Sequence, residues 1–157
     1  MARSIAFIAI ASICCLSLVR LASCSDFIVT GRVYCDTCRA GFETNLTTYI
    51  SGVPLKIECE DREGDHPKVV IDGVTDETGT YQIPVAGEHE DDICEVMVTE
   101  SPMADCNELS PNRNRARVLL AKNSGMPSRL RYANSIGFLK KEPLPECGPL
   151  LQELLAE

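Results

Sequence analysis

The sequence contains no tryptophan and few other aromatic residues, with four phenylalanines and four tyrosines among 157 residues. A carbohydrate-binding site usually stacks sugars on exposed aromatic rings. After the core is filled, eight aromatic residues leave few for such a site. Histidine is scarce as well, since only His66 and His89 occur and both lie in acidic segments. No G-x-S-x-G elbow and no recognisable Ser-His-Asp context is present. We therefore predict no enzyme activity, no metal site and no cofactor.

Basic residues are in the minority, with 15 lysines and arginines against 23 aspartates and glutamates and a formal net charge of −8. Two of the basic residues, Arg3 and Arg20, belong to the leader described next, and without them the charge is near −10. Nucleic-acid binding depends on cations that neutralise phosphates, so this balance argues against a nucleic-acid partner.

Residues 1–25 have the features of a secretory signal peptide. Arg3 gives a short positive start, and the apolar run at 5–19 is shorter than the roughly 20 residues that a membrane span needs. The small residues of "LASCS" offer a cleavage site after Cys24 or Ser25, although an uncleaved anchor is the alternative. No later segment is suited to cross a bilayer, so we expect a secreted, extracellular protein without membrane insertion.

Cysteine, by contrast, is abundant, with nine residues. Three of them leave with the leader, and six remain in residues 26–157: Cys35, Cys38, Cys59, Cys94, Cys106 and Cys147. An even number of cysteines in an oxidising compartment predicts three disulfides. For a domain with so few aromatic residues, such covalent links matter for stability.

The stretch "GRVYCDTCRAG" (31–41) places Cys35 and Cys38 three positions apart. Such a pair can be a redox centre, half of a zinc site or two anchors of a disulfide framework. A redox pair needs a following helix to lower the thiol pKa, and none is predicted after Cys38. Zinc needs a second ligand pair, whereas the other cysteines stand alone. We therefore predict two disulfide anchors, each with a different distant partner.

Alternation of apolar and polar residues dominates residues 26–157 and predicts an all-β protein. Seven strands are predicted, at 26–35, 53–60, 68–74, 80–86, 92–99, 115–121 and around 130–139. They indicate one domain, an antiparallel β-sandwich or partly closed barrel of transthyretin or immunoglobulin type. The leucines of 150–155 follow Pro149 at helical spacing and predict a short C-terminal helix.

Two local features refine this fold. In "GVTDETGTY" (73–81) a polar turn with Gly79 at a position suited to positive φ predicts a hairpin between its flanking strands, similar to those of transthyretin-like sandwiches. Cys59 ends the apolar face of one strand, and Cys94 shares a face with Val96 and Val98 of another. A buried cross-link between these two cysteines is therefore predicted, while spacing alone leaves the remaining pairs open.

The stretch "GRVYCDTCRAGF" resembles the signature of the pollen major olive allergen (Ole e I) family, which includes anther-specific secreted proteins. The resemblance continues through "IECE", "DGVTDETGTY", "DICEV", "ADCNE" and "GFLKKEPLPEC" and covers nearly all of the mature chain. It implies the pairs Cys35–Cys106, Cys38–Cys147 and Cys59–Cys94. Residues 110–132 diverge from the family pattern, so no partner contact can be transferred there.

Asn45-Leu46-Thr47 is the sole N-x-[ST] sequon and lies in a polar segment between strands. We predict a glycan on Asn45, and the resemblance points the same way. The acidic run at 88–92 lacks the alternating ligands and central glycine of a calcium loop. We interpret it as a solvated hairpin turn.

One basic feature departs from the acidic background. Arg113, Arg115 and Arg117 alternate and so share one face of an extended chain. Arg129 and Arg131 alternate in the next segment, and pairing of the two segments as a hairpin would gather five guanidiniums beside Lys122. This face is either a solvated strand surface or a site for a polyanion or an acidic partner.

The resemblance implies a secreted, non-enzymatic plant protein that binds or signals in pollen hydration, germination or pollen tube growth. The implied partner is a receptor kinase ectodomain. The alternatives are a structural module that binds the pectin of the cell wall and an inhibitor of a secreted hydrolase.

Overall fold

The structure, a computed structural model, describes residues 26–63 and 67–156. The predicted signal peptide and His66 lie outside the described residues. Within that part of the chain, no helix has the length and apolar character needed to span a membrane.

The described residues form ten strands and one helix. The strands are β1 (Phe27–Asp36), β2 (Thr48–Tyr49), β3 (Pro54–Asp61), β4 (Pro67–Val74), β5 (Thr80–Val85), β6 (Asp92–Val98), β7 (Glu108–Leu109), β8 (Arg115–Val118), β9 (Leu130–Tyr132) and β10 (Ile136–Leu139), and the helix is α2 (Cys147–Leu155). All seven predicted strands are present, and the predicted C-terminal helix is confirmed. The very short strands β2 and β7 were not predicted.

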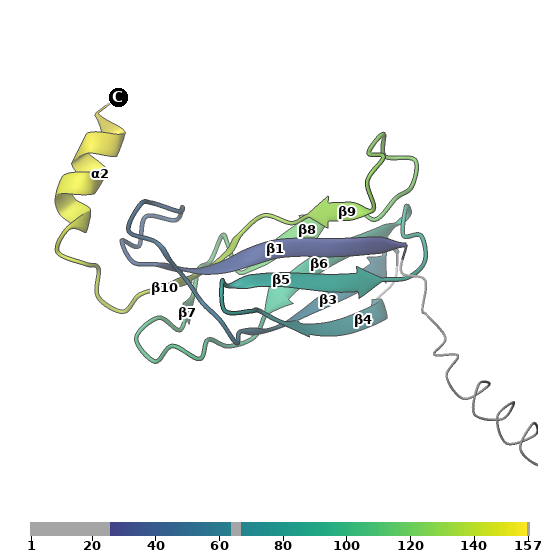
Figure 1. The fold of residues 1–157 in the computed structure, drawn as a ribbon, viewed down its shortest axis with the longest axis horizontal. Helices are drawn as coiled ribbons and strands as arrows, with labels where there is room; N and C mark the ends of the chain where they lie inside the picture. Colours follow the sequence, from purple (N-terminus) through teal and green to yellow (C-terminus); the bar gives the residue numbers. More distant parts are fainter. Residues whose placement is uncertain (1–25, 64–66, 157) are drawn as a thin grey trace, which may run out of the picture.

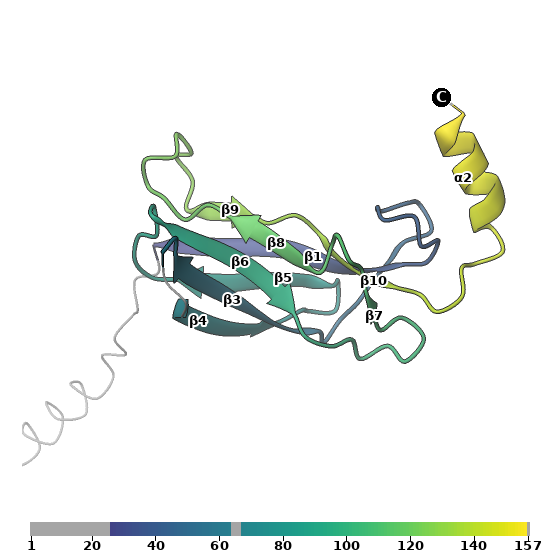
Figure 2. The same cartoon turned by 180° about the vertical axis from the view of Figure 1, so that it is seen from behind.

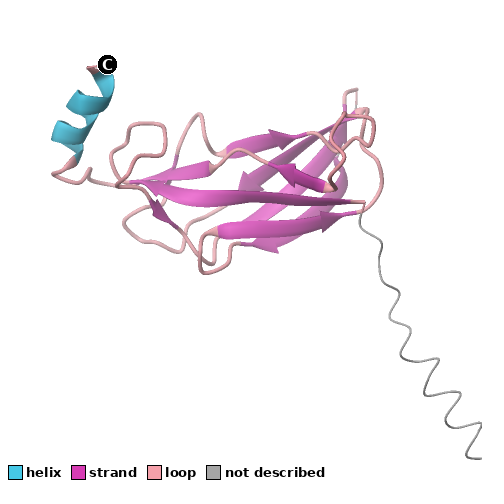
Figure 3. Ribbon diagram, turned by 45° about the horizontal axis from the view of Figure 1, so that its top comes forward, coloured by secondary structure: helices cyan, strands magenta, loops and turns pink. Residues whose placement is uncertain are grey.

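The strands form two sheets that stack face to face (Figures 1 and 2). One sheet has the order β4-β3-β6-β8, and all its pairs are antiparallel. The other is built around β1, whose first half pairs with β5 and β9 and whose second half pairs with β2 and β10. Strand β7 completes it by pairing with β10. The helix α2 extends from one end of the sandwich, apart from both sheets (Figure 3).

The core lies between the sheets and follows the predicted alternation. In β3, Leu55, Ile57 and Cys59 are buried while the residues between them are partly exposed. The largest fully buried side chains are Tyr34, Tyr81, Phe27 and Phe138. Four of the eight aromatic residues are therefore part of the core. Their burial stabilises the fold by about 25 cal/mol per Å² of apolar area removed from water.

The predicted last strand is interrupted, and its pairing differs from the prediction. Tyr132 pairs with Thr30 and Ile136 with Val33, so the later segment advances four residues while β1 advances three. The extra residue is taken up at 133–135, as in a β-bulge, and divides the stretch into β9 and β10. Both run parallel to β1, so the expectation of a purely antiparallel sheet was wrong. The long connection that separates them from β1 permits the parallel arrangement.

The predicted hairpin at 73–81 is also wrong, although its turn is present. Asp76 and Thr80 close the turn by a backbone hydrogen bond, and Gly79 has a φ of 71°. The flanking strands nevertheless belong to different sheets, because β4 pairs with β3 and β5 pairs with β1. Gly79 packs closely on the sheet built around β1, where an added Cβ would lie 2.6 Å from Cβ of Tyr49 in β2. The turn is therefore an arch between the two layers.

Candidate functional site

The C-x-x-C stretch ends β1 and sends its two cysteines to different partners. Cys35 is joined to Cys106, and Cys38 is joined to Cys147 at the start of α2. The carboxylate of the buried Asp36 accepts backbone N–H groups of Cys38, Ala40 and Gly41 and so fixes the loop between them. These are the pairs that the resemblance implies. With both sulfurs in disulfides, the stretch is an anchor of the fold.

Arg39 connects the same loop to Glu108 of β7 and to Lys140, which follows β10. Its φ of 53° lies in the left-handed region, and its guanidinium forms two hydrogen bonds with Glu108 of β7, at 2.8 and 2.9 Å. It also donates to the carbonyl oxygen of Lys140. The paired guanidinium lowers the pKa of the Glu108 carboxyl below its ordinary value.

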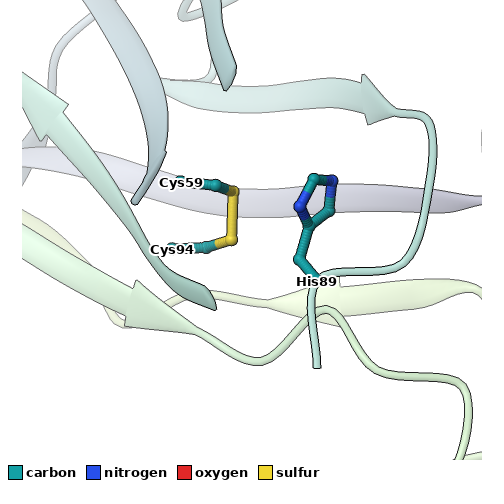
Figure 4. Close-up of side chains that lie close together, drawn as sticks. All are labelled: Cys59, His89 and Cys94. Carbon is teal, nitrogen blue, oxygen red and sulfur yellow. A yellow bond between two sulfur atoms is a disulfide. The ribbon is translucent and has the colours of Figure 1, made fainter. Parts of the chain in front are cut away.

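The third disulfide, Cys59–Cys94, joins directly opposite residues of β3 and β6, and His89 lies beside it (Figure 4). The ligand atoms of the three residues lie within 4.8 Å of one another, a spacing that would suit a metal ion. The sulfurs are bonded to each other, however, and so are not thiolates that could bind zinc. The prediction of a buried cross-link between these strands is confirmed.

His89 is buried, a feature that the sequence did not indicate. Its Nδ1 lies 2.9 Å from Oδ2 of Asp92, and its Nε2 lies 3.2 Å from the carbonyl oxygen of Ala86. The hydrogen bond from His89 and a second one from Lys68 lower the pKa of Asp92. The acidic run at 88–92 therefore contains one buried side chain, that of His89. The run joins β5 of one sheet to β6 of the other. Its interpretation as a solvated hairpin turn was wrong.

The five arginines do not form one face. Arg115 and Arg117 project from β8, and both contact Glu95 of β6, at 3.1 and 3.4 Å. Arg113 precedes that strand, in the turn after Ser110. The hairpin with the Arg129 segment does not exist, because β8 pairs with β6 while β9 pairs with β1 in the other sheet.

Arg131 corrects the prediction most clearly, since it is only 3% exposed. Its guanidinium carbon lies 4.8 Å from the centre of the Phe27 ring, and its NH groups donate to backbone carbonyl oxygens, including that of Ala121 at 3.0 Å. The alternation of residues in the sequence predicted that Arg131 shares a solvent-exposed face with Arg129. In the structure Arg129 is exposed, whereas Arg131 points inward and holds the segment between β8 and β9 against β1.

Arginines line several hollows on the described surface, two of which contain Arg113 or the pair Arg129 and Arg131. The first, of about 420 Å³, is lined by Tyr34, Phe42, Glu43, Arg113, Asn134 and Ser135 among others. The second, of about 440 Å³, lies at the start of β1 and includes Lys122, Arg129 and Arg131. Burial, followed by the nearby Asp36 carboxylate, raises the pKa of Tyr34 in the first hollow.

The sequon lies in the loop that follows Arg39. Asn45 is exposed in a turn, as an attached glycan requires, and the hydroxyl of Thr47 accepts the N–H of Thr44. Glycosylation of Asn45 stays a prediction.

These features define a class of protein: a two-sheet β-sandwich with three disulfides, no thiol left free among the described cysteines and a short terminal helix. The chain belongs to the family described as "Pollen protein Ole e 1 like", whose sequence model matches residues 25–155. This family of pollen allergens is generally non-catalytic.

Individual relatives agree with this assignment. The chain is 50% identical to the pollen-specific protein C13 of Zea mays over 129 residues, which cover 82% of this chain and 76% of that protein. It is 46% identical to an Olee1-like protein of Betula pendula (98% and 95% covered) and 38% identical to the anther-specific protein LAT52 of Solanum lycopersicum (95% and 94%). The crystal structure of the plantain pollen allergen Pla l 1 matches with a TM-score of 0.69 at 30% identity, covering 77% of this chain and 98% of that one.

Proposed function

We propose that this chain is a secreted pollen or anther protein that acts by binding a partner in the plant extracellular space. Family membership carries the proposal, because relatives that span most of the chain are described as pollen-specific or anther-specific. Three disulfides support export, since such bonds persist in oxidising compartments. Its role is that of a ligand in pollen hydration, germination or pollen tube growth, and its partner is the ectodomain of a receptor kinase.

Binding fits the chemistry of the described residues better than catalysis does. The six described cysteines are bonded in pairs. Both ring nitrogens of His89 are engaged with Asp92 and Ala86, so this imidazole serves the fold. The groups that most often act as nucleophile or base are thus part of the scaffold.

The proposal is tested by removing the gene product from pollen and restoring it. Loss is expected to reduce hydration, germination or tube length, and the full chain is expected to restore them. A chain without residues 1–25 is the matched control and should fail, because it would not be exported. Normal pollen in the absence of the protein, or rescue by the control chain, would contradict the proposal.

A second candidate function, binding of acidic cell-wall polysaccharide, is favoured by the hollow that contains Arg113. The guanidinium of Arg113 has no acidic partner within 4 Å among the described residues. Asn134 and Ser135 add polar groups to the same wall, although Glu43 at the rim opposes an anion. The sugar carboxylate of pectate would be held by the guanidinium of Arg113.

This second function is tested on immobilised pectate at low salt. Arg113→Ala should reduce retention, while Arg115→Ala combined with Arg117→Ala should change it less, because Glu95 already neutralises part of that pair. Equal retention of both variants and the parent would remove pectate binding from consideration at this hollow.

A further inference from the structure

The hollow at the start of β1 has an unusual charge balance for this acidic protein. It lies between the first residues of β1 and the segment 122–131, at the end of the sandwich opposite α2 (Figure 1). Three cations line it, Lys122, Arg129 and Arg131, against a single carboxylate, Asp26. The whole chain has a formal net charge of −8, so a local excess of positive charge is not expected from composition.

The single carboxylate is already engaged. One oxygen of Asp26 lies 3.2 Å from Nζ of Lys122, and the other accepts the backbone N–H of Gly87 at 2.9 Å. Lys122 is also 3.9 Å from Glu88. Arg129 donates its Nε–H only to the backbone carbonyl oxygen of Asp26, at 3.2 Å. No carboxylate oxygen of the described residues lies within 4 Å of the Arg129 guanidinium, so its charge is less closely paired than that of Lys122.

The buried Arg131 adds to the excess of positive charge in this hollow. All its hydrogen bonds go to neutral acceptors, namely backbone carbonyls and the hydroxyl of Ser124, and its Nε is buried without an acceptor among the described residues. The ring of Phe27 contributes only a cation–π contact. A guanidinium in a low-dielectric site without a counter-ion raises the local potential, and an incoming anion would lower its energy.

The same hollow also has an apolar wall. Met126 and Pro127 line it, and both are exposed, Met126 by 43%. Methionine is flexible and polarisable, and it adapts to apolar side chains of different shape. A ligand that pairs a carboxylate with an apolar group therefore fits the lining better than a wholly polar sugar acid does.

We propose that this hollow is the docking site for an extended acidic segment of the partner protein. A glutamate or aspartate of that segment would lie against Arg129 and Lys122, and a neighbouring apolar side chain would lie against Met126 and Pro127. Charge complementarity selects this occupant. The loop that carries Asn45 is at the opposite end of the molecule, so a glycan there would leave the hollow open (Figure 1).

This inference rests on the proposed binding function, since it names the surface and the chemistry of the partner. A test with a defined peptide keeps the two separable. The probe is a short acetylated and amidated peptide with alternating glutamate and leucine, titrated into the secreted protein at low salt. The matched probe has glutamine in place of every glutamate.

The acidic peptide is expected to bind and the glutamine peptide is not. Arg129→Ala combined with Lys122→Ala should weaken binding about fivefold or more, because both exposed cations that face the peptide carboxylate are then removed. Met126→Ser should also weaken it. Arg131 is left unchanged because its removal would disturb the fold, and Arg115→Ala with Arg117→Ala is the control of equal charge change on the other sheet.

Several outcomes would overturn the docking site. They are equal binding of the two peptides, equal loss in the control variant, and parent-like affinity after Arg129 and Lys122 are replaced. Competition by oligogalacturonate with equal strength and the same dependence on Arg129 would also overturn it, because the hollow would then be a general anion site. Peptide binding by a protein whose loss leaves pollen normal would instead contradict the proposed function alone.

Discussion

Nδ1 of His89 lies 2.9 Å from Oδ2 of Asp92, both side chains are almost fully buried, and His89 lies beside the Cys59–Cys94 disulfide. The two residues close the connection between β5 and β6, where the chain crosses from one sheet to the other. Lys68 of β4 contacts the second oxygen of Asp92 at 3.0 Å. These three polar side chains therefore link the β5–β6 connection to β4, at the edge of the four-stranded sheet.

Asp92 should contribute an acid-sensitive share of stability. Its pKa is lower in the folded than in the unfolded chain, where it is 3.8, so its contribution is complete above pH 3.8 and is lost as the pH falls through the folded value. Asp92→Asn is expected to cost about 1–3 kcal/mol near neutral pH and much less in strong acid. Urea unfolding across this range measures both. Asp91→Asn, an exposed neighbour, is the control, and an equal effect of the two changes would contradict the role of the His89 pair.

Tyr81 should tolerate loss of its hydroxyl. This oxygen is buried without a hydrogen-bond partner among the described residues, and burial raises the pKa of Tyr81 well above its ordinary value. Tyr81→Phe is therefore expected to leave the free energy of unfolding unchanged or to raise it by about 1 kcal/mol. Tyr132→Phe, at a side chain that is 77% exposed, should have no effect. A clear loss of stability in Tyr81→Phe would show that the hydroxyl has a bonding partner, such as a buried water.

The disulfides should be complete and structurally necessary. Thiol titration of the denatured secreted protein is expected to find no free cysteine, and peptide mapping should recover Cys59–Cys94. Replacing both of these cysteines with alanine should cost about 2–5 kcal/mol, because the unfolded chain loses a constraint across a separation of 35 residues. A single replacement should be secreted less well, since its partner thiol stays free. A free thiol in the major species or bound zinc would refute the framework.

The glycan prediction is tested by expression in plant cells. Deglycosylation should lower the mass of the parent, and Asn45→Gln should abolish this shift without changing the unfolding midpoint, because Asn45 is exposed. Thr47→Ser keeps the sequon and the hydroxyl that accepts the Thr44 N–H, so it should keep the glycan. If the parent and Asn45→Gln migrate alike before treatment, the site is unused.

The strands were predictable because alternation is local, whereas their partners were not. Residues 73–81 and 110–132 both look like hairpins in sequence, yet each connects strands of different sheets. The choice between a hairpin and an arch depends on which layer can bury the next apolar face, and this is a property of the whole core. The disulfide pairs came from the resemblance and, for Cys59–Cys94, from shared faces.

The arginines show the same limit at the level of single side chains. Around Arg131 the usual rule is inverted, because Tyr132 is 77% exposed while the charged residue is buried. Nothing in "SRLRYANS" marks Arg131 as the inward one. Its position follows from the ring of Phe27, which is distant in sequence, and from the carbonyl group of Ala121, which is ten residues away. The hollow that Arg131 lines could therefore not be predicted from the sequence.

The pairing of β1 sets an order in which the chain can fold during synthesis. β1 leaves the ribosome first among the strands, but β5 follows 44 residues after its end and β9 and β10 come close to the end of the chain. The sheet β4-β3-β6-β8 uses only residues 54–118, so it can form with its disulfide while β1 still lacks β9 and β10. Cys38, whose partner is 109 residues away, must remain available until Cys147 has been synthesised. Among the six described cysteines, the first two to be synthesised are thus the last to be paired, and a stalled chain would expose them as reactive thiols.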